Sequence, residues 1–130
     1  MKKLFFVLVV IFVLCSVNGF AAENQTTLTF AWGQDTTNLD HWTLYQSNVA
    51  GGPYTKVLDI PWNGQSSSAY TASNNFVITG NPGETITKYF VVTASSVTEE
   101  SGNSNEISYA FLIPAPISTP FSLTITVETP

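Results

Sequence analysis

The stretch K-Y-F-V-V-T-A (88–94), which follows the run G-N-P-G (80–83), is the most strand-like part of the chain. Its side chains alternate between two faces, and both faces are apolar or β-prone. A strand of this kind normally lies in the middle of its sheet. The Gly and Pro residues before it favour a chain reversal. The sequence therefore predicts a central strand over 87–95 that is entered from a tight turn.

Further runs of alternating apolar and polar residues lie on both sides of this strand. Beyond the first 20 residues no segment shows a helical period. Short strands separated by turn signals about every 8–12 residues are typical of an antiparallel β-sandwich. We therefore expect an all-β fold of about seven strands. The expected strands are 27–32, 42–47, 54–60, 70–79, 87–95, 105–113 and 121–128.

The apolar positions of these strands predict a core that is rich in aromatic residues. In each strand every second residue faces the same side, so the alternating apolar residues are expected to point inward. The expected core residues are Trp32, Trp42, Leu44, Phe76, Ile78, Phe90, Val92, Ile107 and Tyr109.

The first residues have the pattern of a secretory signal peptide. Lys2 and Lys3 precede an apolar run over 4–14, and small residues at 19–22 offer a cleavage site. The apolar run is about half as long as a membrane-spanning helix requires. We expect residues 1–21 to be removed and the remaining protein to be secreted, periplasmic or at the cell surface. An uncleaved membrane anchor is the alternative.

The composition of the remaining chain excludes several partners. After removal of the signal, Lys56 and Lys88 stand against nine carboxylates, a formal charge of −7. Nucleic acids and anionic membranes attract clustered Lys and Arg, so neither is an expected partner. The one cysteine, Cys15, lies in the signal, so neither a disulfide nor thiol chemistry is expected.

Several segments, taken in order, resemble the fibronectin type III family. They are L-T-F-A-W (28–32, strand B), H-W-T-L-Y (41–45, strand C), G-N-P-G-E-T-I-T-K-Y-F-V-V-T-A (80–94, the E–F turn and strand F) and S-G-N-S-N-E-I-S-Y (101–109, the entry into strand G). The resemblance covers about residues 28–111. It implies an immunoglobulin-like sandwich over 22–113.

The N-terminus departs from the family pattern. About six residues separate Ala21 from Leu28, too few for a first strand A and its turn at about 3.3 Å per residue. A Pro-rich connector (114–120) leads instead to a C-terminal segment (121–130) that reads like a strand A. Three interpretations remain open: the tail docks on its own domain, it is donated to the next molecule, or it is a loose tail or the first strand of a further domain.

Four acids in two expected loops are candidates for ligand contact. They are Asp35 and Asp40 in loop 33–41, and Glu99 and Glu100 in loop 96–104. The resemblance implies that these loops share one pole of the sandwich. Carboxylates can hold Ca²⁺ or act in pairs on glycosides, but no metal-binding spacing and no buried acid mark such a site. We expect solvated loop acids and neither a metal nor a cofactor.

Two further residues of the same pole carry alternative interpretations. Trp62 follows Pro61 in a Gly/Ser/Asn loop, where an exposed indole can stack on a sugar or dock on a protein. The competing interpretation is a Trp folded back over the edge of the core. His41 is the only histidine and has no recognisable nucleophile motif, so we expect no enzyme.

These observations predict an exported binding or spacer module rather than a catalyst. Its polar loops are expected to contact a protein or a carbohydrate at one pole. The alternative is a structural subunit that assembles by donating its C-terminal strand. The first predicts a monomer and the second a strand-exchanged homo-oligomer.

Overall fold

A computed structural model describes residues 21–117 and 123–124 of the chain. They form six β-strands: β1 (Ala22–Trp32), β2 (His41–Ser47), β3 (Thr55–Pro61), β4 (Tyr70–Gly80), β5 (Thr85–Ser95) and β6 (Ile107–Leu112). The predicted all-β class is confirmed. The expected seventh strand, 121–128, lies outside the described residues except for Leu123 and Thr124. No helix in the described part of the chain has the length and hydropathy needed to cross a membrane.

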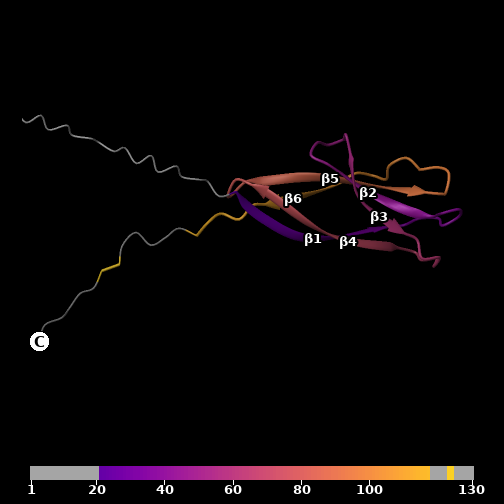
Figure 1. The fold of residues 1–130 in the computed structure, drawn as a ribbon, viewed down its shortest axis with the longest axis horizontal. Coiled ribbons are helices and arrows are strands. Elements are labelled where there is room, and N and C mark those ends of the chain that lie inside the picture. Colours follow the sequence, from indigo (N-terminus) through magenta and orange to yellow (C-terminus); the bar gives the residue numbers. More distant parts are fainter. Residues whose placement is uncertain (1–20, 118–122, 125–130) are drawn as a thin grey trace, which may run out of the picture.

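The strands form two antiparallel sheets that face each other (Figure 1). β1 pairs with β4 over its whole length, from Ala22 opposite Gly80 to Trp32 opposite Tyr70. The larger sheet has the order β3-β2-β5-β6. β5 therefore has a neighbour on each side, which confirms the central position predicted from its two apolar faces.

The two sheets are held together by a cluster of aromatic rings. Phe90 of β5 lies between Phe30 of β1 and Phe76 of β4, with ring centroids 5.1 Å and 5.3 Å away. The steep angles between these rings suit the attraction between ring edges and faces. Of the expected core, Trp42, Leu44, Phe76, Ile78 and Phe90 are buried, and Trp32 and Val92 are half-buried.

Ile107 and Tyr109 correct the predicted core, because they are 49% and 42% exposed. Their pairing opposite Phe90 and Lys88 of β5 gives them the same face as the buried Phe90 ring. The strand pattern therefore predicted their direction correctly. They remain exposed because the opposing sheet has only β1 and β4, so no described strand covers the outer part of β6.

The sandwich has two different ends. The segments 33–40, 62–69 and 96–106 gather at one end, here called the loop end (Figure 1). The turn 81–84 lies at the opposite end, here called the turn end, whereas segment 48–54 lies beside residue 106, because the Gly51 N–H donates to the Glu106 carboxylate at 2.8 Å. β1 begins and β6 finishes at the turn end, where the Asn24 side chain donates a hydrogen bond to the Leu112 carbonyl at 2.6 Å.

The turn that leads into β5 closes the sandwich at the turn end. Gly83 has a φ of 82°, a left-handed conformation that favours glycine. Its N–H donates to the Ile113 carbonyl at 2.9 Å, and the Ile113 N–H donates to Glu84 at 2.8 Å. These bonds hold the buried Ile113 side chain under the turn. The predicted Gly-Pro turn is therefore confirmed as the entry to β5.

Candidate functional site

The backbone of Asp40 joins the three segments of the loop end. Its N–H donates to the carbonyl of Ser95, which ends β5, at 2.8 Å. Its carbonyl accepts from the N–H of Trp62, which follows β3, at 3.1 Å. Backbone hydrogen bonds of this kind fix the bases of loops that would otherwise be mobile. The loop end is thus one connected surface and not three separate loops.

An open cleft lies between segments 34–40 and 94–101 of this surface. The residues that line it include all four candidate acids, which are Asp35, Asp40, Glu99 and Glu100. Neither of the lysines that the structure describes, Lys56 and Lys88, is among them. The cleft is therefore lined by carboxylates without a cation to neutralise them, and its potential is negative.

Asp35 is held in place by its own loop. Its Oδ1 accepts from the Thr37 N–H at 2.9 Å and from the Thr37 hydroxyl at 2.8 Å. The Thr37 backbone N–H, and then its hydroxyl, lower the pKa of Asp35 below its ordinary value. The carboxylate is therefore charged at neutral pH and has a fixed orientation at the rim of the cleft.

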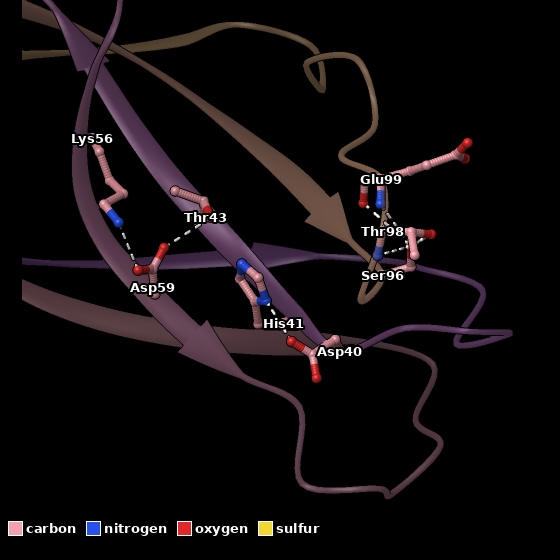
Figure 2. Close-up of polar contacts among 8 residues, drawn as sticks. All are labelled: Asp40, His41, Thr43, Lys56, Asp59, Ser96, Thr98 and Glu99. Atoms are coloured by element: carbon pink, nitrogen blue, oxygen red, sulfur yellow. Dashed lines mark hydrogen bonds and ion pairs between the residues drawn. The ribbon is translucent and has the colours of Figure 1, made fainter.

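The carboxylates of Asp40 and Glu99 have different surroundings (Figure 2). Asp40 Oδ2 lies 2.8 Å from Nδ1 of the neighbouring His41. The Glu99 side chain points away from the loop, while its backbone N–H donates to the Ser96 hydroxyl at 3.0 Å. Ser96 also accepts from the Thr98 N–H at 3.2 Å. The Ser96 hydroxyl thus shapes a tight loop that presents the Glu99 carboxylate outward.

Glu100 lines the cleft and also accepts hydrogen bonds from two strands of the larger sheet. Its Oε1 accepts from the Tyr45 hydroxyl at 2.7 Å and from the Thr93 hydroxyl at 2.6 Å. The bond from Thr93, and then that from Tyr45, lowers the pKa of Glu100. The same contact raises the pKa of Tyr45, because ionised tyrosine would face the carboxylate. Glu100 therefore ties the end of β5 to β2 across the outer face of the larger sheet.

Sequence reasoning missed a second carboxylate on this outer face, Asp59 of β3 (Figure 2). It accepts from Lys56 Nζ at 2.7 Å and from the Thr43 hydroxyl at 2.9 Å. The bond from Lys56, and then that from Thr43, lowers the pKa of Asp59. Aspartate is depleted within strands, so its place in V-L-D-I (57–60) was the signal that could have marked it.

Trp62 is folded partly into its own loop. Its indole Nε1 donates to the Gln65 carbonyl at 3.0 Å, and the side chain is half-buried. The Gln65 N–H in turn donates to the Asn63 side chain at 3.1 Å. Trp62 does not line the acidic cleft. This geometry favours the interpretation in which the indole covers the edge of the sandwich.

The acids of the loop end are spread out in the part of the chain that the structure describes. Within residues 21–117 and 123–124, no three His, Cys, Asp or Glu side chains come together as a metal-binding group. The cleft carboxylates are spread over two loops, and Glu100 already accepts two protein hydroxyls. The surface can offer negative charge to a ligand, but its acids do not converge on one point.

No protein-family model, no curated protein and no solved structure matches this chain. What can be inferred about its function comes from its residues and their geometry.

The contact between Glu100 and Tyr45 predicts loss of stability at both extremes of pH. Because the pKa of Glu100 is lowered by folding, its contribution is complete above about pH 4.5 and is lost as pH falls through the lowered value. Because the pKa of Tyr45 is raised, its contribution is complete below about pH 10 and is lost as pH rises through the raised value.

Urea unfolding at a series of pH values measures this effect. The variant Glu100→Gln is expected to have a flatter acid limb than the wild type. The control Glu23→Gln, an exposed acid of β1, is expected to keep the wild-type profile. An unchanged acid limb in Glu100→Gln would show that the hydrogen-bonded carboxylate does not stabilise the fold.

Proposed function

We propose that this chain is an exported, non-catalytic module of the fibronectin type III kind that binds a partner through its loop end. The family assignment is supported by the strand pairing. β1 and β4, the expected strands B and E, pair with each other, and β2, β5 and β6, the expected strands C, F and G, are neighbours in that order. Export is supported by the charge and apolar pattern of residues 1–21.

The acidic cleft is the observation that carries the proposed binding role. Its walls come from two loops whose bases are joined through the Asp40 backbone, so the surface is ordered before a ligand arrives. Preorganised loops lose less conformational entropy on binding than mobile loops. A rigid scaffold with polar loops at one end is a common design for recognition.

The charge of the cleft favours a basic segment of a protein over a neutral carbohydrate. Asp35 and Glu99 are among the residues that line the cleft, and no lysine of the described residues lines it. Opposite charge speeds the encounter of two partners and selects between them. The half-buried Trp62, with its indole N–H bonded inside its loop, offers less area for stacking on a sugar ring.

The double variant Asp35→Asn/Glu99→Gln is expected to weaken binding of a lysine-rich peptide by roughly 2- to 30-fold, since each exposed ion pair contributes about 0.2–1 kcal/mol. Fluorescence anisotropy with a labelled peptide measures the affinity, and added salt is expected to weaken it further. Glu23→Gln, far from the cleft, is the matched control. The control removes one negative charge and the double variant removes two, so a loss of binding free energy in the control that is half as large as in the double variant would mean that only net charge matters and would reject the cleft.

A glycan array tests the carbohydrate alternative with the same proteins. We expect that Trp62→Ala abolishes the binding of no glycan that binds the wild type. Such a glycan would move the site to the Trp62 loop and would replace the peptide as the ligand class. Trp62→Ala is expected to leave peptide binding within the error of the wild type, because Trp62 does not line the cleft.

A further inference from the structure

The outer edge of β1 is unpaired in the part of the chain that the structure describes. β1 pairs with β4 on one side over 11 residues, and no described residue pairs with its other side. An unpaired edge exposes backbone N–H and C=O groups that can accept another strand. β1 has no Pro, no Lys and no break in its register, and its one charged residue, Glu23, lies at its start, so most of this edge lacks the usual features that block edge pairing.

A groove of core residues opens beside this edge. The half-exposed Ile107 and Tyr109 lie on the inner face of β6, where no described strand covers them. Ile107 lines a cavity of about 80 Å³ together with Phe30, Leu44 and Phe90, among other residues. Exposed apolar surface that continues into a core marks a place where a further element can be accommodated.

Trp32 places a buried hydrogen-bond donor that lacks an acceptor in the same groove. It lines the cavity, and its buried indole N–H has no hydrogen-bond partner among the described residues. A buried donor without a partner is costly, and a neighbouring backbone carbonyl would remove that cost. Among the described residues nothing pairs with the outer edge of β4 either, but the cavity lies on the side of β1.

The chain contains a segment that fits this edge. Residues 121–128 place four apolar side chains on one face, Phe121, Leu123, Ile125 and Val127, and Ser, Thr and Glu on the other. Eight residues in a strand span about 27 Å, so the segment can follow most of β1. Two apolar residues flank the start of this segment, Ile117 before it and Leu123 after it. Their side chains are 96% and 93% exposed and therefore do not pack on their own sandwich.

The direction of the tail decides which sandwich it can complete. β1 runs from the turn end to the loop end, so an antiparallel partner must enter at the loop end. The tail leaves its own sandwich at the turn end, next to Asn24. Its connector 114–120 reaches about 22 Å in an extended polyproline geometry. That is too short to recross a β1 strand of about 37 Å.

We infer that residues 121–128 of one copy pair antiparallel with β1 of a second copy, which joins copies head to tail and replaces the monomer expected of a binding module by a homo-oligomer. A second sandwich, placed in line with its loop end towards the turn end of the first, receives the tail without any reversal of direction. The segment then completes the sandwich by covering Ile107 and Tyr109. Thr124 lies opposite Thr29 in the register that places Leu123 opposite Phe30.

Cysteines in this register test the inference directly. In the Cys15→Ser background, the double variant Thr29→Cys/Thr124→Cys is expected to give disulfide-linked ladders on a non-reducing gel. Mixing the two single variants is expected to give a linked dimer. The matched control pairs Thr124→Cys with Asn75→Cys, which lies on the same outer face of β4 and is expected to stay unlinked.

Three outcomes of the cross-linking would overturn the inference. Monomers with a bridge inside one chain would place the tail on its own sandwich. Absence of any bridge, or equal ladders with Asn75→Cys, would show that β1 is not a specific acceptor. Ladders that require both Thr29→Cys and Thr124→Cys would support head-to-tail donation.

Light scattering after size-exclusion chromatography gives a second readout without cysteines. The wild type is expected to form oligomers that grow with concentration. Leu123→Asp is expected to weaken association by roughly 10- to 100-fold, because a buried apolar side chain is replaced by a charge. Thr124→Asp, on the opposite face of the segment, is the control that keeps the oligomers. A wild type that stays monomeric, or a Leu123→Asp variant that assembles normally, would contradict the inference.

Discussion

Replacing Phe90 with alanine is expected to lower the free energy of unfolding by about 3–5 kcal/mol, the usual cost of removing a buried aromatic ring. Phe90 is 1% exposed and touches Phe30 and Phe76, one from each strand of the opposing sheet. Its removal leaves a cavity at the point where the two sheets meet. The rigid packing around it limits how far the neighbours can fill that space.

Urea unfolding followed by tryptophan fluorescence measures this loss. A domain of this size has only about 5–15 kcal/mol to lose, so Phe90→Leu serves as a milder variant if the alanine variant does not fold. Val97→Ala is the matched control, because Val97 is 87% exposed and its truncation is expected to change stability by less than about 0.5 kcal/mol. Equal stability of Phe90→Ala and Val97→Ala would show that Phe90 is not at the centre of the core.

Phe111→Ala is expected to cost about 3–5 kcal/mol, whereas Tyr109→Ala is expected to cost about 1 kcal/mol or less in the monomer. Both rings lie on one face of β6, with centroids only 4.8 Å apart. Phe111 is fully buried near the turn end and contacts Phe76, whereas Tyr109 is 42% exposed. The difference arises because the opposing sheet covers one position and not the other.

The comparison should be made in the Leu123→Asp background, where the groove beside β1 is expected to stay open. In the assembled wild type the donated segment would cover Tyr109, and the cost of Tyr109→Ala is expected to rise. A Tyr109→Ala variant that is as unstable as Phe111→Ala in the monomer would show that another element of the same chain covers β6.

β5, which has a paired strand on each side, was the most predictable strand of the fold. β5 was predicted within two residues because its alternation and its Gly-Pro turn agree with each other. β1 begins five residues before the predicted start, because A-E-N-Q-T (22–26) carries no apolar alternation. Those residues become a strand only because β4 supplies backbone partners for them, which is a tertiary effect.

The direction of the side chains was predictable from the sequence, but whether the opposing sheet covers them was not. The alternation of β6 correctly gave Ile107 and Tyr109 an inward direction, but their exposure depends on how many strands the opposing sheet contains. At the loop end the acids were found from the sequence, but their roles were not. Glu100 turns onto Tyr45 and Thr93, two residues that are distant from each other in the sequence, and no local pattern predicts this contact.

Hydrogen exchange of the β1 amides tests the central claim, an open β1 edge that a second copy closes. In the monomeric Leu123→Asp variant, every second amide of β1 is expected to exchange fast, because it points away from β4, while amides throughout β5 exchange slowly. In concentrated wild-type protein, the fast amides of β1 are expected to become protected. The same pattern of protection in β1 for both proteins would contradict the account.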